Sequence, residues 1–446
     1  MRKETVMTFE ARRVTGQPSG VWAGDFGDVR HATCCVIGCG PAGAMLGLML
    51  AREGVDVLVL EKHKDFLRDF RGDTLHPSTM EIMDELGLAD GLLGLTHTKA
   101  RRITARLPGR TVTVADLGPL KTRYPYITFM PQWDFLDYVT REARRYPSFR
   151  LQMEAEAKSL ILEDGVVRGV RYETPDGPRE ARALLTVSAD GRSSPFREQA
   201  GLKVVGTSPP IDVLWFRLPR LEADPGDTFG YAGKGRFMAV INRGEYWQIA
   251  FVIKKGEYQR VRAEGLDVFR RSVGEAIPEF AGRTEELREW EDLKLLTVQA
   301  DRLRRWHRPG LLCIGDAAHA MSPVGGVGIN LAIADAVAAA NALSGPLVAG
   351  RVRVRDLARV QLRRWLPTRV IQTLQSFAQQ RVVSSSLKSD GAPSIPTLAK
   401  LVLRLRPVRG LPARIIAFGI WPEHVKRREI SARTGRSPVA NEESVR

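Results

Sequence analysis

A glycine-rich turn between an apolar strand and a helix constrains the fold of this chain more than any other feature. Residues 38–43 read Gly-Cys-Gly-Pro-Ala-Gly, directly after an apolar segment at 32–37 and at the start of a helix-forming segment at 41–53. A second apolar run follows at 55–60. Strand, G-x-G-x-x-G turn, helix and strand in this order predict a βαβ unit that binds a dinucleotide.

Each position of the turn has a physical task. Gly38 allows the tight turn, Gly40 lets the backbone approach a pyrophosphate, and Gly43 lets the helix pack closely on the strand. Pro41 and Ala42 begin the helix, whose free N–H groups favour an anion. These residues are therefore predicted to hold the cofactor.

An acidic residue closes the second strand of the unit. Glu61 lies 23 residues after Gly38, close to the ~20 expected for the acid that accepts a hydrogen bond from a cofactor ribose. We assign Glu61 and the adjacent Lys62 to the same site. A glycine turn without a ligand is the alternative, which the matching positions of strand, helix and acid disfavour.

Two further segments point to FAD. Residues 188–193 read Ser-Ala-Asp-Gly-Arg-Ser, and residues 313–319 read Cys-Ile-Gly-Asp-Ala-Ala-His. The second segment leads into Pro-Val-Gly-Gly-Val-Gly-Ile-Asn at 323–330. With these motifs in this order, the chain resembles the class A flavoprotein monooxygenases, the para-hydroxybenzoate hydroxylase-like FAD enzymes, over residues 32–345.

The resemblance implies roles for single residues. Asp190 and Gly191 match the motif that approaches both the FAD pyrophosphate and the nicotinamide cofactor. Gly315 and Asp316 match the motif whose aspartate accepts hydrogen bonds from the flavin ribityl hydroxyls. Gln132 matches the position that holds the adenosine side.

The same resemblance extends to one more segment. Arg71 and Gly72 lie where the family has a basic residue near the isoalloxazine ring of a mobile flavin. Arg71 is the one side chain that we consider for a direct catalytic part. The chemistry otherwise belongs to the flavin, so no further catalytic side chain is predicted.

A glycine turn before the last long helix also has a direct physical interpretation. Residues 325–328 lead into a predicted helix at 326–343, so their N–H groups and the positive end of the helix dipole face whatever binds there. Such donors at the N1–C2 carbonyl edge of a reduced flavin would stabilise its negative charge. A plain loop is the alternative. The residues assigned to the cofactor here are Pro323, Gly325, Gly326, Val327, Gly328, Ile329 and Asn330.

Periodicity along the rest of the chain sets the fold class. Turns at 163–165 and 175–177 predict a β-meander, and strands at 236–241 and 246–253 predict a hairpin. We expect an α/β protein with a Rossmann-like FAD-binding domain of the glutathione reductase type, an inserted mixed or antiparallel β-sheet substrate domain, and C-terminal helices. The expected parts are an N-terminal extension at 1–30, poorly ordered; the FAD-binding domain at 31–100, 131–205 and 301–346; the substrate domain at 101–130 and 206–300; and a basic helical region at 347–446.

The strand at 246–253 is apolar on both faces. By alternation, its two sets are Trp247, Ile249, Phe251 and Ile253, and Tyr246, Gln248, Ala250 and Val252. We expect one set to pack on helices or on the FAD-binding domain and the other to wall an apolar pocket, with an ordinary buried sheet as an equal alternative.

Other reactive side chains receive structural interpretations. No carboxylate lies at a sequence spacing from His76 or His319 that would indicate a paired partner. We therefore expect these histidines to make packing or solvent contacts rather than to act as acids or bases. The four cysteines, Cys34, Cys35, Cys39 and Cys313, are expected to be small buried hydrophobes. No metal site is predicted.

The formal charge of +16 is concentrated at one end of the chain. Residues 351–446 hold 17 Arg, 3 Lys and 6 acidic residues, a net of +14. This uneven distribution and the absence of a zinc, repeat or RNP-type signature disfavour nucleic acid as a partner. The stretch 394–424 mixes arginines with bulky apolar residues, which suits either peripheral membrane contact or, as we favour, helices that cap the substrate domain.

The combined hypothesis is an FAD-dependent, NAD(P)H-using monooxygenase. The resemblance implies transfer of an oxygen atom from O2, through a flavin C4a-hydroperoxide, to an apolar aromatic or polycyclic substrate in secondary metabolism. No signal peptide is evident, so a cytoplasmic location is expected. The alternatives are a reductase or oxidase that acts on a hydrophobic substrate or on flavin, and a membrane-surface or nucleic-acid binding protein with a non-catalytic nucleotide fold. Oligomeric state is left open.

Overall fold

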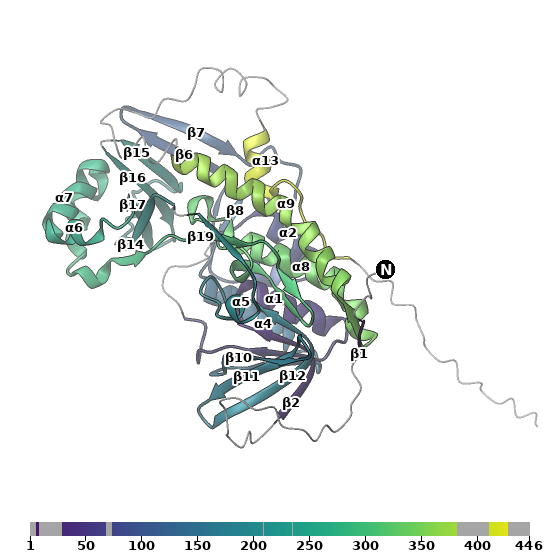
Figure 1. Cartoon of the computed structure of the whole chain (residues 1–446). Coiled ribbons are helices and arrows are strands. Elements are labelled where there is room, and N and C mark those ends of the chain that lie inside the picture. The colour runs from purple at the N-terminus through teal and green to yellow at the C-terminus, as the bar shows by residue number, and fades with distance from the viewer. Residues whose placement is uncertain are drawn as a thin grey trace, which may run out of the picture.

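The computed structural model describes residues 6–8, 29–67, 74–207, 209–233, 235–380 and 410–426. They form two main sheets, one of eight strands and one of seven, toward opposite ends of the molecule (Figure 1). The short sheets are β1 (Val6–Thr8) with β22 (Arg351–Arg353); β13 (Val204–Thr207) with β19 (Ala300–Leu303); and β4 (Thr74–Leu75), β8 (Ile127–Phe129) and β5 (Thr98–Ala100). The β1–β22 pair corrects, for residues 6–8, the expectation of a poorly ordered N-terminal extension.

The eight-stranded sheet contains the predicted βαβ unit. Its strands are β10 (Glu156–Glu163), β11 (Val166–Thr174), β12 (Gly177–Ser188), β2 (Val29–Ile37), β3 (Val57–Leu60), β9 (Phe149–Gln152), β20 (His307–Arg308) and β21 (Leu311–Cys313). The central strands β3, β2, β12 and β21 are parallel and buried, as continuous apolar runs predict. The four cysteines lie in or next to these strands, buried and free, which confirms their assignment as core residues.

Four helices pack beside this sheet. They are α1 (Pro41–Arg52), α4 (Gln132–Ala143), α8 (Gly328–Val348) and α9 (Val354–Ala378). Helix α1 packs against both α4 and α8, and α9 lies along α8 (Figure 1). Residues 324–348 are apolar enough to cross a membrane, but most of the described α8 is buried between its neighbours, which is the ordinary environment of a core helix.

The seven-stranded sheet is built from two separate stretches of chain. Its order is β18 (Lys294–Leu296), β14 (Ile211–Pro219), β17 (Tyr246–Lys254), β16 (Arg236–Asn242), β15 (Phe229–Gly233), β6 (Arg102–Leu107) and β7 (Arg110–Asp116). The predicted β16–β17 hairpin is present, with Gly244 at a φ of 87° in its turn. Strands β15 and β6 pair in parallel and the other pairs are antiparallel, so the sheet is mixed.

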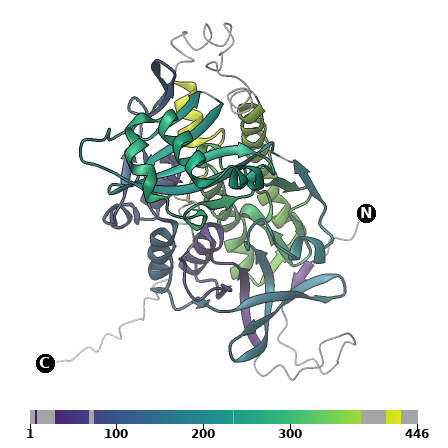
Figure 2. The ribbon, with the colours of Figure 1, turned by 90° about the vertical axis from the view of Figure 1, so that its left-hand side faces the viewer.

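The two faces of the seven-stranded sheet have different neighbours. The face that carries Trp247, Ile249 and Phe251 packs against α7 (Leu266–Ala276) and the 3-10 helix η1 (Pro278–Glu286). Figure 2 shows this helical layer in front of the sheet. The opposite face, with Ala250 and Val252, packs against Val324, which lies in the 3-10 helix just before α8.

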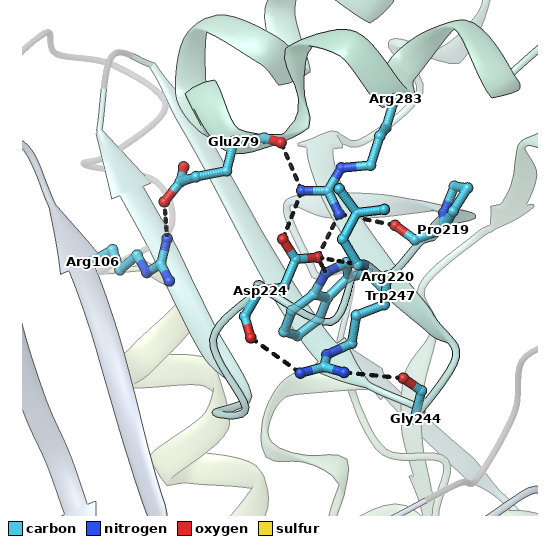
Figure 3. A network of polar contacts seen from close by, with 9 residues as sticks. Arg106, Pro219, Arg220, Asp224, Gly244, Trp247, Glu279 and Arg283 are labelled. Atoms are coloured by element: carbon cyan, nitrogen blue, oxygen red, sulfur yellow. Dashed lines mark hydrogen bonds and ion pairs between the residues drawn. The ribbon is translucent and has the colours of Figure 1, made fainter.

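A polar network fastens the helical layer to the sheet (Figure 3). The Asp224 carboxylate accepts hydrogen bonds from Trp247 Nε1 at 2.8 Å and from the Arg283 guanidinium, with 3.0 Å between Asp224 Oδ1 and Arg283 NH2. These hydrogen bonds lower the pKa of Asp224 to about 2 against the opposing effect of burial. The helical layer therefore covers this face of the sheet.

The remaining described helices are short. They are α2 (Pro77–Glu85), α3 (Ala89–Leu93), α5 (Phe196–Gln199), α6 (Tyr258–Ala263), η2 (Trp290–Asp292), η3 (Gly315–Ala317), η4 (Val324–Gly326) and α13 (Leu411–Phe418). Within the described part of 394–424, Ala417 of α13 is buried with Leu117, Ile127 and Phe129. This packing agrees with a C-terminal helix that caps the molecule. Residues 394–409 lie outside the described residues.

Candidate functional site

Three of the predicted motifs meet at the carboxyl ends of adjacent parallel strands. Gly38 N donates to Leu60 O at 2.7 Å, Ala189 N to Ile37 O at 2.8 Å, and Ile314 N to Ser188 O at 3.0 Å. The acid after β3, the glycine turn after β2, the Asp-Gly pair after β12 and the Gly-Asp pair after β21 therefore lie at one edge of the sheet. This edge is where open α/β sheets bind their ligands.

The spacing of the first glycine turn fits a pyrophosphate. A Cβ atom at Gly43 would lie 1.9 Å from Gly38 O, and one at Gly38 would lie 2.7 Å from Ala189 O, so both positions require glycine. A Cβ atom at Gly40 would meet no described atom within 4 Å. Helix α1 begins at Pro41 without a side-chain cap or an acidic residue in its first turn. The chain thus packs tightly below the turn and leaves room and N–H donors above it, as FAD requires.

Glu61 lies directly beside this turn. Its carboxylate accepts hydrogen bonds from Cys39 N at 2.9 Å and from His63 N at 3.2 Å. The side chain is held in one place next to the glycines, where an acid that binds ribose is expected. Lys62 is exposed. Gln132 is the partly buried first residue of α4, which packs on α1.

The Asp-Gly pair is held from below by hydroxyl groups. Ser188 Oγ donates to Asp190 Oδ1 at 2.5 Å, and Ser194 also hydrogen bonds to this carboxylate. Burial nevertheless raises the pKa of Asp190 above its usual value. Gly191 has a φ of 92° and open space where a Cβ would be, so a ligand can approach its backbone.

The Gly-Asp pair occupies the 3-10 helix η3. Asp316 keeps 32% of its side chain exposed, and an Arg192 nitrogen lies 3.8 Å from its Oδ2, so the carboxylate reaches the surface of the site beside a cation. Gly315 has a φ of 59°, and a Cβ there would lie 3.1 Å from the Ala42 side chain. The Gly-Asp pair therefore packs directly against the first turn of α1.

The helix that follows the second glycine turn begins two residues later than predicted, and the turn itself is not α-helical. Gly325 and Gly326 adopt φ values of 82° and 61° within η4, and α8 begins at Gly328 rather than 326. A Cβ at Gly326 would lie 2.9 Å from Thr74. Helix α8 has no side-chain cap, so its first N–H groups stay available. Pro323, Val327 and Ile329 flank this turn.

Asn330 holds the turn through a saturated amide. Its Oδ1 accepts from His76 N at 2.8 Å and Thr79 Oγ1 at 2.7 Å, and its Nδ2 donates to Thr74 O at 2.9 Å and Gly326 O at 3.0 Å. All four hydrogen-bonding positions are used within the chain. Asn330, which the sequence placed among the cofactor-binding residues, therefore positions the turn.

A row of glutamines on α9 holds the segment that precedes the turn. Gln375 Nε2 donates to Ser322 O at 2.9 Å and Val324 O at 2.7 Å, and Gln379 Nε2 hydrogen bonds to Ser322 Oγ. Gln372 Nε2 donates to Ala320 O at 3.3 Å. The spacing 372, 375, 379 places all three on one helix face. The sequence analysis did not identify these glutamines, although a stripe of uncharged polar residues on an otherwise basic helix indicates a face that forms hydrogen bonds.

His319 corrects an expectation from the sequence. It has a carboxylate partner, because its Nε2 lies 2.5 Å from Asp335 Oδ2, and both side chains are buried. Asp335 also accepts from Gly315 N at 3.0 Å and from Arg364 Nε at 2.9 Å, and Arg364 NH1 reaches Glu423 at 3.4 Å. These four side chains, here the Asp335 cluster, connect the Gly-Asp motif to α8, α9 and the C-terminal segment. The 16-residue separation of His319 and Asp335 hid the pair.

His76 is buried and structural. Its Nδ1 lies 2.6 Å from Ile416 O, and because a carbonyl only accepts, this nitrogen carries the proton. Burial lowers the pKa of His76 to about 4. This histidine ties α13 to the start of α2. Arg71 and Gly72 lie outside the described residues.

The face of the seven-stranded sheet opposite α7 forms an apolar wall. Val213, Ala250 and Val252 are buried there, and Val324 of η4 packs against the same group. The partly exposed members of this wall are Trp215, Phe237, Ala239 and Leu296. Of the two alternating sets on the strand at 246–253, the one with Ala250 and Val252 therefore faces the second glycine turn. The set with Trp247 packs against α7 and η1.

The sequence and the structure both have known counterparts. Residues 31–355 match the family model described as FAD binding domain. The chain is 33% identical over 399 residues to 6-methylpretetramide 4-monooxygenase of Streptomyces rimosus, an alignment that covers 88% of this chain and 93% of that protein.

Solved structures show the same fold. The OxyS anhydrotetracycline hydroxylase from Streptomyces rimosus superposes with a TM-score of 0.67 at 22% identity, covering 87% of this chain and 76% of that one. The p-nitrophenol 4-monooxygenase PnpA from Pseudomonas putida DLL-E4 superposes with a TM-score of 0.68 at 19% identity, covering 87% and 94%.

Proposed function

The chain belongs to the class A FAD-dependent monooxygenases, and from this premise we propose that it hydroxylates an apolar aromatic or polycyclic substrate with NAD(P)H and O2. Bound FAD would supply the redox chemistry of this reaction, namely hydride acceptance from NAD(P)H and activation of O2. The residues of this chain bind and orient the reactants and exclude water. The observation that carries the proposal is the apolar wall opposite the second glycine turn.

The FAD-holding residues fall into two groups by position. Gly40, Ala42 and Gly43 offer the pyrophosphate open space and the N–H groups of α1, while Glu61 is placed for the adenosine ribose. Asp316 is placed for the ribityl hydroxyls. We infer that the first N–H groups of α8 stabilise negative charge on the reduced ring.

Substrate chemistry follows from the wall. Partly exposed Trp215 and Phe237 present large apolar surfaces beside Val324, which suits a flat, multi-ring molecule rather than a charged one. The relatives named above act, by their names, on pretetramide, anhydrotetracycline and nitrophenol compounds. A polycyclic phenolic compound of secondary metabolism is the substrate class that we propose.

Isotope labelling tests the reaction type. Purified holoenzyme is supplied with NADPH or NADH, 18O2 and a panel of polycyclic phenols, and the products are measured by mass spectrometry. The proposal expects one 18O atom in the product. Turnover that yields an unlabelled product would instead indicate a reductase or an oxidase.

A pair of variants tests the wall. Trp215→Ala should raise KM for the substrate about tenfold or more, since a buried aromatic contact contributes on the order of 1–3 kcal/mol. Trp290→Ala, on the helical side of the same sheet, is the matched control and should leave KM close to that of the wild type. Equal KM values in both variants would contradict the placement of the substrate.

A further inference from the structure

A surface hollow beside the eight-stranded sheet is lined by positively charged side chains. Its volume is about 330 Å³, and its lining contains no acidic side chain. It lies between the segment that follows α5 and the segment that precedes β20. The cations that line this basic hollow are Lys203, Arg304, Arg305 and Arg308, and His307 lies among them.

The cations of the basic hollow lack counter-charges. Among the described residues, no carboxylate forms an ion pair with Lys203, Arg304 or Arg305, whereas about half of the other described arginines have an acidic partner. Arg308 donates only to carbonyl oxygens, Ala200 O at 3.1 Å and Gly165 O at 2.8 Å. Like charges held together without compensation attract an anion.

His307 forms the inner wall of the hollow. It is 7% exposed, and its Nδ1 is buried without a hydrogen-bond partner in the described structure. Burial, with a further contribution from Arg305, lowers the pKa of His307 to about 4, so the ring is neutral at pH 7. A second hollow of about 610 Å³, on the α9 side of the same segment, also has His307 in its lining, together with Arg355, Ala358, Arg359, Gln361, Leu362 and Trp365.

The two hollows together match one class of ligand. The basic hollow offers guanidinium groups, which bind phosphate oxygens through paired N–H donors. The second hollow offers the indole of Trp365, which is 37% exposed. Arg369 lies over this ring at 4.7 Å from its centroid, so the opposite ring face is the one that can stack on an aromatic base. Phosphates attached to an aromatic base describe a nucleotide.

We propose that the basic hollow and its neighbour bind the adenosine and pyrophosphate part of NAD(P)H, an inference that rests on the proposed function. The reaction needs a second dinucleotide besides FAD, but the sequence contains a single G-x-G-x-x-G motif, at 38–43. A second site therefore lacks this kind of glycine turn, and side-chain cations offer another way to bind phosphates.

The hollow is connected to the flavin-binding motifs through short pieces of chain. His307 pairs with Leu312 across β20 and β21, and Gly315 follows three residues later, roughly 10 Å away at the strand rise. On the other wall, α5 lies between Asp190-Gly191 and Lys203, and Arg197 of α5 hydrogen bonds to Arg192 O and Asp301. Both walls thus continue into residues assigned to FAD.

Binding of ADP to the FAD-saturated holoenzyme tests the proposal directly. ADP carries the adenosine and pyrophosphate of NAD(P)H, and titration calorimetry detects its binding without turnover. We expect the double variant Arg304→Ala/Arg305→Ala to bind ADP about tenfold to a hundredfold more weakly, because it loses charge-assisted hydrogen bonds to the phosphates. KM for the nicotinamide cofactor should rise by a similar factor.

Control variants separate this effect from a general loss of charge. Arg262→Ala/Arg288→Ala removes two exposed arginines from the seven-stranded half and should leave ADP binding unchanged. Trp365→Ala should weaken ADP binding without affecting the binding of inorganic pyrophosphate. Equal ADP affinity in the hollow and control variants would overturn the proposal.

Two further outcomes are distinguishable. Arginine-dependent binding to phosphatidylglycerol vesicles, with no binding of ADP, would overturn the proposal in favour of a lipid headgroup. If ADP binds as expected but 18O does not enter the product, the nucleotide site stands and the proposed oxygen insertion fails.

Discussion

Two places in this molecule, the Asp335 cluster and the basic hollow, handle positive charge in opposite ways. In the Asp335 cluster, Arg364 is 1% exposed, and its guanidinium lies between the carboxylates of Asp335 and Glu423. In the basic hollow, Lys203, Arg304 and Arg305 are exposed, without a carboxylate partner in the described structure. Buried charges persist only when they are compensated in place, whereas exposed uncompensated charges cost little and can serve a ligand. The first set should matter to folding and the second to binding.

The largest expected effect comes from breaking the buried set. Arg364→Met leaves the buried Asp335 carboxylate without its arginine and removes one of the two arginines beside Glu423, which should lower the free energy of unfolding by about 3–5 kcal/mol. Urea denaturation of the holoenzyme measures this loss. Because Asp335 also accepts from Gly315 N, FAD should dissociate more readily from the variant.

A neighbouring arginine provides the control for this experiment. Arg363 contacts the same Glu423 at 2.8 Å, but 35% of its side chain is exposed. Arg363→Met should therefore cost less, on the order of 1 kcal/mol, because this guanidinium is partly solvated and the buried Glu423 keeps Arg364 as its cation. Equal losses in both variants would show that burial does not set the difference.

Acid should reveal the buried titratable groups of the same region. The pKa of His76 is lowered from 6.5 to about 4, so between these values the unfolded chain binds more protons than the native one. Stability from this group is present above pH 6.5 and is lost as the pH falls toward 4. The loss should be on the order of 3 kcal/mol.

His76→Gln isolates this contribution, because glutamine does not titrate. The variant should show a flatter fall in stability between pH 6.5 and 4 than the wild type, measured by urea denaturation at each pH. Below this range Asp335 acts in the same direction, because His319 and Arg364 keep its pKa below the usual value. Parallel pH profiles for variant and wild type would contradict the assignment.

A smaller effect is expected at Gln375, where α9 contacts the segment that leads into the second glycine turn. Gln375→Leu removes the two donors that hold Ser322 O and Val324 O, which should cost about 1–3 kcal/mol of stability. A shift in the flavin reduction potential would show that the row positions the turn and does not merely stabilise α9. Thr373→Ala, on the exposed face of the same helix, is the matched control and should move neither quantity.

Sequence reasoning found the parts of the site that local rules determine. The turn at 38–43 and the Asp-Gly and Gly-Asp pairs follow from glycines that must accept positive φ or close approach, and these requirements are visible in one short segment. Burial of the cysteines followed from their apolar neighbours. Likewise, alternation correctly separated the two faces of the strand at 246–253.

What sequence reasoning missed depends on contacts between distant segments. The His319–Asp335 pair and the glutamine row on α9 form only after α8 and α9 fold back on the Gly-Asp motif. Likewise, the total charge did not distinguish Arg364 from Arg304, because pairing depends on which acid packs against each arginine. The sequence pointed to the C-terminal charge, while the uncompensated cluster combines residues near 203 and 305.

The smallest expected effect on stability completes the comparison. Arg304→Ala/Arg305→Ala removes two exposed cations that contact no acid in the described structure, so the free energy of unfolding should change by no more than about 0.5 kcal/mol in the absence of nucleotide. With saturating ADP, the wild type should gain stability and the variant should gain less, because only the native state offers the assembled hollow. Thermal unfolding with and without ADP measures both quantities. A large loss of stability without ADP would mean that these arginines serve the fold, as Arg364 does, and the contrast between the two regions would disappear.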